Sequence, residues 1–203
     1  IPLGIGDDAA VVNLPRGKQW VVTTDALVEG VDFRSCELSP EKIGRKALAV
    51  NLSDLAAMGA KPAAFLITIG KPRKVSTAWL LRFYDGVLKL AREWNIPCVG
   101  GDISRSKEFF ANVTALGEVR KGKAVTRAGA MPGDWIAVTG SLGGSLLRHH
   151  HDFVPRLAEA DFLSRGGFVT AMIDISDGLI RDLEHILKAS KVGARVDLGG
   201  IPV

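Results

Sequence analysis

The chain has 203 residues and a formal net charge of +4, with 47% hydrophobic, 24% charged and 6% aromatic residues. This length can form one large or two small domains, and the composition is typical of a soluble globular protein. Basic residues are scattered apart from one loose cluster in 120–127 and aromatic residues are few, which excludes a nucleic-acid-binding stripe. No apolar run approaches the roughly 20 residues of a membrane span, so we expect no membrane partner.

The first part of the chain predicts strands that alternate irregularly with helices. An acidic, glycine-flanked loop at 4–8 precedes a short apolar run at 9–12. Runs of β-branched and other apolar residues predict strands at 20–24, 63–69, 97–99 and 109–119. The segment 76–94 predicts an amphipathic helix, because its large apolar residues share one side.

A buried helix is predicted over 39–59, which opens with a Ser-Pro pair and stops at a glycine. Its apolar residues surround the helix axis, which indicates burial on all sides. Asn51 and Asp54 are three residues apart and therefore share one face. A buried carboxylate is costly without a positive partner, and neither nearby lysine is an obvious one, so a bound cation is the candidate. Alternatively, Asp54 lies at a solvated helix end and caps a loop.

The polar link at 120–134 contains glycine and proline and is the predicted domain boundary. It separates a first domain, 1–131, from an incomplete second domain, 132–203. In the second domain we predict strands at 135–139, 170–175 and 194–198 and helices at 157–163 and 176–190. Several strands adjoin without a helix between them, so the predicted class is α+β. The first domain then has a mixed sheet and the second is a partial α/β domain.

The positions of the aspartates indicate the chemistry. Six of them follow short apolar runs, open a helix or lie on the buried helix: Asp8, Asp25, Asp54, Asp102, Asp174 and Asp177. Strand ends and their loops are where separate elements converge on a site. Converging carboxylates repel each other, and Mg²⁺ relieves that repulsion while sharing oxygens with substrate phosphates. The set predicts a multi-Mg²⁺ nucleotide site, whereas each aspartate alone is more simply a turn or N-cap residue.

Two glycine segments are compatible with phosphate binding through backbone N–H groups. Gly100 and Gly101 precede an aspartate, and 140–144 contains further glycines. No GxxxxGK[ST] motif occurs, which excludes a P-loop. Arg127, in the link, either closes on a phosphate or is a solvated loop charge. The consecutive histidines 149–151 are a surface run more simply than zinc ligands, because neighbours on a helix do not share a face.

Cysteine usage and the chain ends bear on location and completeness. Cys36 and Cys98 form no CxxC pair, so they are most simply free thiols in a reducing compartment such as the cytoplasm. No signal peptide is visible. The chain does not begin with Met and ends just after a predicted strand, so we expect a fragment with both natural ends missing.

Six segments occur in the same order in the thiamine-monophosphate kinase family: GIGDDAAVV, TTDALVEGVDF, KALAVNLSDLAAMGA, VGGD, TRAGAMPGDWIAVTG and AMIDISDGLIRDL. From about residue 3 to residue 203 the chain resembles this family, which belongs to the aminoimidazole-ribonucleotide-synthetase-like ATP-binding superfamily. The resemblance implies ATP-dependent phosphorylation of thiamine phosphate to thiamine diphosphate by direct in-line transfer with several Mg²⁺ ions. It also implies a homodimer in which the sheets of two first domains close into a barrel.

The resemblance also implies roles for individual residues. The positions that match metal ligands are Asp8, Thr23, Thr24, Asp25, Asp54, Asp102, Asp174 and Asp177. The positions that match ATP contacts are Gly101, Asp102, Arg127 and Ser176. No catalytic residue beyond these metal and phosphate ligands is expected, because phosphoryl transfer needs mainly positioning and charge neutralisation.

Two departures from the family concern the acceptor. The family usually has His in its E-G-x-H-F segment, where it contacts the substrate, and this chain has Asp32 there. A carboxylate at that place would repel a phosphate unless a metal or a proton intervenes. The family's C-terminal Gly-Gly-Glu-Asp segment and a later aromatic that packs on thiamine are absent, which implies that part of the pocket is missing. The alternatives are a related ATP-dependent synthetase with another acceptor and a non-catalytic metal- or nucleotide-binding module.

Overall fold

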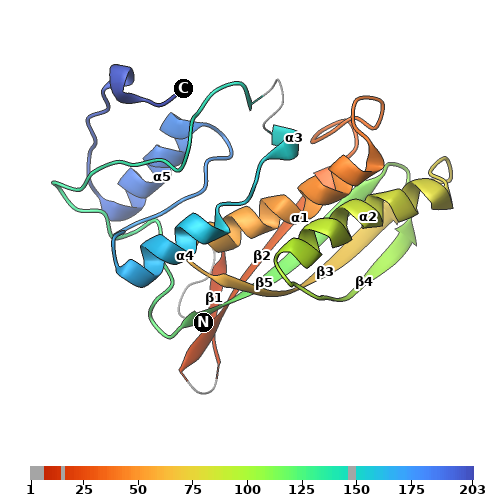
Figure 1. The fold of residues 1–203 in the computed structure, drawn as a ribbon, viewed down its shortest axis with the longest axis horizontal. Helices are drawn as coiled ribbons and strands as arrows, with labels where there is room; N and C mark the ends of the chain where they lie inside the picture. The colour runs from red at the N-terminus through yellow and green to blue at the C-terminus, as the bar shows by residue number, and fades with distance from the viewer. Residues whose placement is uncertain (1–6, 15–16, 146–149) are drawn as a thin grey trace.

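The computed structural model describes residues 7–14, 17–145 and 150–203, and a five-stranded mixed sheet lies at its centre (Figure 1). The strands are β1 (Ala10–Asn13), β2 (Lys18–Val28), β3 (Lys61–Lys71), β4 (Cys98–Arg105) and β5 (Phe110–Arg120). Their order is β1-β2-β5-β3-β4, in which β3 and β4 run parallel and the other neighbouring pairs are antiparallel. The predicted α+β class with a mixed sheet is confirmed.

The helices α1 (Pro40–Ala57) and α2 (Thr77–Glu93) cover one face of this sheet (Figure 1). Each begins after a serine, Ser39 or Ser76, whose hydroxyl accepts a backbone N–H from the first turn. Such N-caps satisfy donors that the helix itself leaves unpaired. Alternate residues of β5 are buried, as expected for a strand with one face against the core. α1 is buried over most of its surface, which confirms the prediction from its apolar sequence.

The two helices cross at glycines that let their backbones touch. A Cβ added at Gly44 would lie 2.0 Å from the carbonyl oxygen of Phe83, and one added at Gly86 would lie 1.9 Å from that of Glu41. Both distances are far below the ~3.5–4.0 Å of an ordinary contact between heavy atoms. Glycine at these two positions therefore sets how closely α2 holds α1 against the sheet.

The remaining helical segments lie on the side of α1 away from α2 (Figure 1). They are α3 (His150–Asp152), α4 (Leu157–Gly166), α5 (Leu179–Ser190) and the 3₁₀ turn η2 (Leu198–Gly200). Leu157 and Ala160 of α4 are buried in the same core as α1. The guanidinium of Arg45 on α1 donates to the carbonyl of Phe153 at 2.7 Å. α1 therefore packs against the sheet, α2 and the second part of the chain.

The strands predicted at 135–139, 170–175 and 194–198 are wrong. None of these segments belongs to a β-ladder of the described residues. Their composition suits a strand, but a strand also needs a hydrogen-bonded neighbour. The backbone of Met172, for example, makes one hydrogen bond, to the carbonyl of Thr126 at 3.2 Å, and no ladder continues from it.

Several predicted elements have shifted ends, and two of these shifts affect predicted site residues. The helix predicted at 176–190 begins at Leu179, after Gly178 with its φ of 116°, a backbone conformation that suits glycine and interrupts a helix. The strand predicted at 97–99 spans Cys98–Arg105, because Cys98 and residues 100–105 pair with β3. The glycines before Asp102 therefore lie in a strand and not in a loop.

Two further predictions remain untested. The sheet lies within residues 10–120, but the domain boundary near Met131 stays a prediction. Dimerisation through the sheet also stays a prediction. No helix within the described ranges is long and apolar enough to cross a membrane.

We expect Gly86→Ala to destabilise the fold, although alanine is the better helix former by up to about 1 kcal/mol. The added methyl group would collide with the backbone of Glu41, and overpacking of this kind typically costs about 1–3 kcal/mol. Chemical denaturation should show a lower free energy of unfolding. The control is Asp85→Ala, an exposed position on the same helix, which should unfold like the wild type. A Gly86→Ala protein as stable as this control would contradict the close helix crossing.

Candidate metal and nucleotide site

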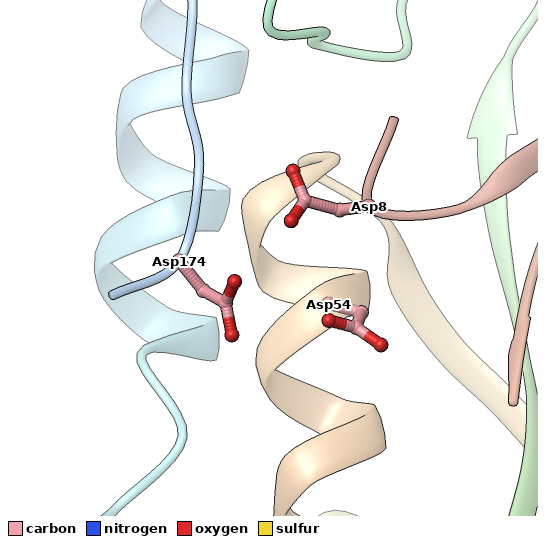
Figure 2. A group of neighbouring side chains, drawn as sticks. All are labelled: Asp8, Asp54 and Asp174. Atoms are coloured by element: carbon pink, nitrogen blue, oxygen red, sulfur yellow. The ribbon is translucent and has the colours of Figure 1, made fainter. Parts of the chain in front are cut away.

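Three of the predicted carboxylates meet at one point of the structure (Figure 2). Asp8 precedes β1, Asp54 lies on α1 and Asp174 lies in the segment before α5. One oxygen atom from each carboxylate lies within 4.8 Å of the other two. Because the three segments are distant in the sequence, only the folded chain brings these groups together.

Asp54 is positioned jointly by α1 and β2. The hydroxyl of Thr23 donates a 2.6 Å hydrogen bond to Oδ2 of Asp54, which fixes one oxygen of the carboxylate. One turn earlier on α1, the side chain of Asn51 accepts the backbone N–H of Asp25 at 3.1 Å. The pairing of β1 with β2 stops at Val22, so a side chain of α1 takes the place of a strand partner beyond that point.

Asp8 is held by Arg127 of the link. Nε and Nη2 of Arg127 donate to the two oxygens of Asp8 at 3.2 and 2.8 Å, which is a bidentate, charge-assisted pair. The backbone N–H of Arg127 also donates to Asp7 at 3.0 Å. The side chain of Asp8 is only 1% exposed, so the guanidinium compensates a carboxylate that water does not reach.

Asp174 is oriented from α1. The hydroxyl of Ser53 donates to Oδ2 of Asp174 at 2.8 Å. Ser53 directly precedes Asp54, so this turn of α1 supplies one carboxylate of the cluster and orients a second. In the part of the chain that the structure describes, the ion pairs of the cluster all involve Arg127, and neither Asp54 nor Asp174 has one.

Burial and mutual repulsion make the cluster reluctant to carry its full negative charge. Burial raises the pKa of Asp54 and the charges of Asp25 and Asp174 add to this, so that the pKa is about 8 despite the hydrogen bond from Thr23, which lowers it. Burial also raises the pKa of Asp174, and the neighbouring Asp8 adds to this. Converging carboxylate oxygens with too little positive charge are the donor set that a hard divalent cation such as Mg²⁺ prefers. The residues present therefore fit the predicted metal, with Asp8, Asp54 and Asp174 as the candidate ligands.

The structure does not bring the side chain of Thr24 into the cluster. Successive side chains of a strand point to opposite faces, and Thr23 points toward Asp54. The hydroxyl of Thr24 instead lies 3.0 Å from that of Thr114 and donates to the carbonyl of Val113 at 3.1 Å.

Asp102 and Gly101 lie on β4, which β5 and β3 separate from β2. The exposed carboxylate of Asp102 accepts a 2.7 Å hydrogen bond from the hydroxyl of Ser104. A Cβ added at Gly101 would lie 1.9 Å from the carbonyl oxygen of Ile67, so close strand packing alone already requires glycine there. The carboxylate of Asp102 is not a member of the three-carboxylate cluster.

Ser176 and Asp177 are exposed in the segment between Asp174 and α5. The carboxylate of Asp177 lies 3.4 Å from the guanidinium of Arg181, one turn further along. These two residues therefore stand next to the cluster in the chain without being part of it.

Asp32 is engaged within its own turn. Its carboxylate accepts the backbone N–H of Val28 at 2.8 Å, and its carbonyl accepts a 2.8 Å hydrogen bond from the ammonium group of Lys46. Burial lowers the pKa of Lys46, and the Asp32 carboxylate opposes this. Asp32 thus stabilises the turn after β2 and is connected to α1, eight residues before Asp54.

Some predicted features fall at the limits of the described residues. Residues 4–6 of the acidic loop and His149 lie outside them. His150 and His151 begin α3 and belong to no carboxylate cluster of the described chain.

Two serines that act through hydrogen bonds to other groups, Ser53 and Ser190, are not among the predicted site residues. The sequence could have indicated Ser53, because it is a polar residue beside Asp54 in an apolar helix. It could not have indicated Ser190, because a serine at a helix end is common. The hydroxyl of Ser190 accepts the N–H groups of Gly129 and Ala130 and donates to the carbonyl of Arg127, at 2.9–3.1 Å. The end of α5 thereby holds the part of the link that presents Arg127.

We expect Asp54→Asn to flatten the pH dependence of stability in metal-free protein. The pKa of Asp54 is about 8 in the folded state and about 3.9 in an unfolded chain. The folded state therefore keeps a proton that the unfolded state has lost, so this contribution to stability is complete below about pH 4 and is lost as the pH rises through about 8. Thermal unfolding should show wild-type stability declining over that range more steeply than that of Asp54→Asn.

Adding Mg²⁺ should stabilise the wild type more at about pH 8 than at about pH 5, because the cation competes with the proton for the same oxygens. The control is Asp85→Asn, an exposed carboxylate on α2, which should keep the wild-type pH profile. Identical pH profiles for wild type and Asp54→Asn would contradict the raised pKa.

Comparison with known proteins identifies the family. Residues 6–119 match the family model for the AIR synthase related protein, N-terminal domain. The thiamine-monophosphate kinases of Rhodopirellula baltica and Escherichia coli K12 are each 40% identical to this chain over its full length. The chain spans 66% and 67% of these relatives, or about two thirds of their length.

Comparison with solved structures gives the same family as the sequence comparison. AaThiL complexed with AMPPCP and TMP has a TM-score of 0.86 and 33% identity over 92% of this chain and 65% of that chain. The thiamine-monophosphate kinase of Stenotrophomonas maltophilia K279a has a TM-score of 0.86 and 38% identity over 99% of this chain and 70% of that one. The chain therefore belongs to the thiamine-monophosphate kinase family, among the proteins with an AIR synthase related N-terminal domain.

Proposed function

We propose that the full-length protein transfers the γ-phosphoryl group of ATP to thiamine phosphate and forms thiamine diphosphate. The observation that carries this proposal is the convergence of Asp8, Asp54 and Asp174 from three distant segments. It is supported by the identity to thiamine-monophosphate kinases and by the likeness to a structure complexed with AMPPCP and TMP. A cytoplasmic location stays a prediction.

Asp8, Asp54 and Asp174 would hold Mg²⁺ in this protein. When bound, the ion would neutralise charge on phosphate oxygens, which is the main electrostatic obstacle when two anionic substrates meet. The cluster is already formed and half-buried, and hydroxyl groups of Thr23 and Ser53 orient two of its carboxylates. Little reorganisation is then needed during the reaction, which is how such sites lower a barrier.

The remaining predicted contacts belong to this proposal. The further metal ligands that we propose are Thr23, Thr24, Asp25, Asp102 and Asp177. Gly101, Asp102, Arg127 and Ser176 are proposed as nucleotide contacts. Arg127 supports this role because Asp7, Asp8 and the hydroxyl of Ser190 fix its position next to the cluster.

No general base is required in the proposed reaction. An oxygen of the acceptor phosphate is already ionised at neutral pH, so the residues of the chain need to align it with the donor and exclude water. The described residues near Asp54 accordingly offer carboxylates and hydroxyls, and we assign no histidine a chemical step.

Asp32 leaves one alternative, a related ATP-dependent synthetase with another acceptor. The family resemblance implies a substrate contact at this position, and here its carboxylate is bound to the N–H of Val28. Full-length protein incubated with ATP, Mg²⁺ and thiamine phosphate should yield ADP and thiamine diphosphate in equal amounts by chromatography. Turnover of ATP without thiamine diphosphate would favour the alternative, and nucleotide binding without turnover would favour a non-catalytic module.

Asp54→Asn in the full-length protein should lower turnover on the order of 10²-fold or more, as expected when a key electrostatic group is lost. The amide keeps the shape of the side chain but removes a charge from the candidate metal site. Steady-state rates at saturating Mg²⁺ test this, together with thermal unfolding to show that the variant is folded. Asp85→Asn should retain the wild-type rate. Near-normal turnover of Asp54→Asn would show that α1 does not contribute to the metal site.

We also propose that the protein dimerises through its sheet. The apolar residues Leu66, Val99 and Ile103 of β3 and β4 are exposed, and the buried neighbours of Leu66 direct it to the face that the helices leave open. Sheet pairing between subunits would cover this face and the strand edge.

Sedimentation of the full-length protein at micromolar concentration should give twice the subunit mass. Leu66→Glu should shift the mass toward that of the monomer, because the new charge would be buried in the pairing surface. The control is Leu81→Glu, which makes the same substitution at a more exposed position on α2 and should leave the dimer intact. A monomeric wild type would contradict the proposal.

A further inference from the structure

Asp182, in the first turn of α5, is a buried carboxylate that neither the metal cluster nor the predicted ATP contacts include. It is 3% exposed. Its Oδ2 atom accepts the backbone N–H groups of Ser176, Asp177 and Gly178 at 2.9, 3.0 and 3.1 Å. One oxygen atom thus binds the three consecutive amides that precede the helix.

This arrangement fixes the segment that carries several predicted site residues. The three amides belong to the chain between Asp174 and Leu179, where α5 begins. Hydrogen bonds from N–H groups to a carboxylate are about twice as strong as neutral ones, and burial limits competition from water. The backbone that follows Asp174 is therefore tied to α5 by a single side chain.

The same arrangement determines what the segment can offer to a ligand. Consecutive N–H groups that point to one place, next to a helix N-terminus, form an anion-binding concavity of the kind that holds phosphate. Here the carboxylate of Asp182 already fills that concavity. The amides of Ser176–Gly178 are then unavailable to a phosphate, and the segment can contribute only its exposed side chains, those of Ser176 and Asp177.

We propose that Asp182 is a positioning residue, which sets the backbone of the 174–178 segment so that Asp174 reaches the cluster from one end and Ser176 and Asp177 face outward at the other. The inference rests on the proposed function in one respect, because it assumes that the cluster holds a divalent cation. The hydrogen bonds of Asp182 on which it is based do not depend on the identity of the acceptor substrate. In the described chain, the hydrogen bonds to the Asp182 side chain all come from backbone amides, so we assign it a role in positioning Asp174 and not a role as a ligand.

The first test measures Mn²⁺ binding to full-length protein without nucleotide or acceptor, by electron paramagnetic resonance. Asp182→Asn keeps the size of the side chain but weakens all three hydrogen bonds. It should reduce Mn²⁺ affinity on the order of 10-fold or more, as changes behind a metal ligand typically do. The matched control is Glu184→Gln, an exposed carboxylate on the same helix, which should bind Mn²⁺ like the wild type.

A double-mutant cycle separates positioning from a purely structural role. If Asp182 acts through Asp174, then Asp182→Asn should cause no further loss of Mn²⁺ affinity in an Asp174→Asn background, while its effect on the unfolding temperature should persist. A lower unfolding temperature with unchanged Mn²⁺ affinity of the folded protein would overturn the proposal.

The second test uses the wild type, so it does not depend on the folding of a variant. Amide hydrogen exchange should show Ser176, Asp177 and Gly178 protected in metal-free protein, with no further protection on adding Mg²⁺ and AMPPCP. Amides that exchange freely and become protected only with the nucleotide would overturn the proposal, because they would then bind phosphate. Both tests omit the acceptor, so they stand even if product analysis identifies a substrate other than thiamine phosphate.

Discussion

The repulsion among Asp8, Asp54 and Asp174 is the constraint on which this structure depends. Three carboxylates within 4.8 Å of each other are tolerated only where neighbouring groups or a cation compensate their charge. The chain supplies part of that compensation through Arg127 and through hydroxyl donors on β2 and α1. The described side chains thus leave the site incompletely neutralised. This agrees with the proposal that the site holds a divalent cation.

The position of α1 determines where the three carboxylates lie relative to one another. The glycine contacts with α2 and the burial of nearly every side of the helix leave it little freedom to shift. Polar side chains at intervals along it hold the end of β2 and the turn after it. The second part of the chain is fastened to the same helix through Ser53 and Arg45. One rigid element therefore provides the reference for groups from both parts.

The sequence predicted those features that are visible in local pattern. Asp54 stood out because a carboxylate in an apolar helix has few explanations, and a run of β-branched and other apolar residues predicted β5. The strands at 135–139 and 170–175 failed because composition does not show whether a partner strand exists. Asp182 and Ser190 escaped notice because their function lies in hydrogen bonds to backbone groups, which any aspartate or serine can make. Those bonds become visible only when the distant segments are placed together.

The Arg127–Asp8 and Ser53–Asp174 contacts join residues 119 and 121 positions apart, and this spacing has a consequence for how the protein is made. Contacts between such distant residues form late, because the intervening chain must first be ordered. During synthesis, Asp54 is enclosed in its helix long before Asp174 leaves the ribosome. A nascent chain can thus acquire its sheet and core while it still has no metal site. If the cluster holds a divalent cation as proposed, binding of that cation would report that the chain has been translated beyond residue 174 and that the segment around Asp174 has docked against α1.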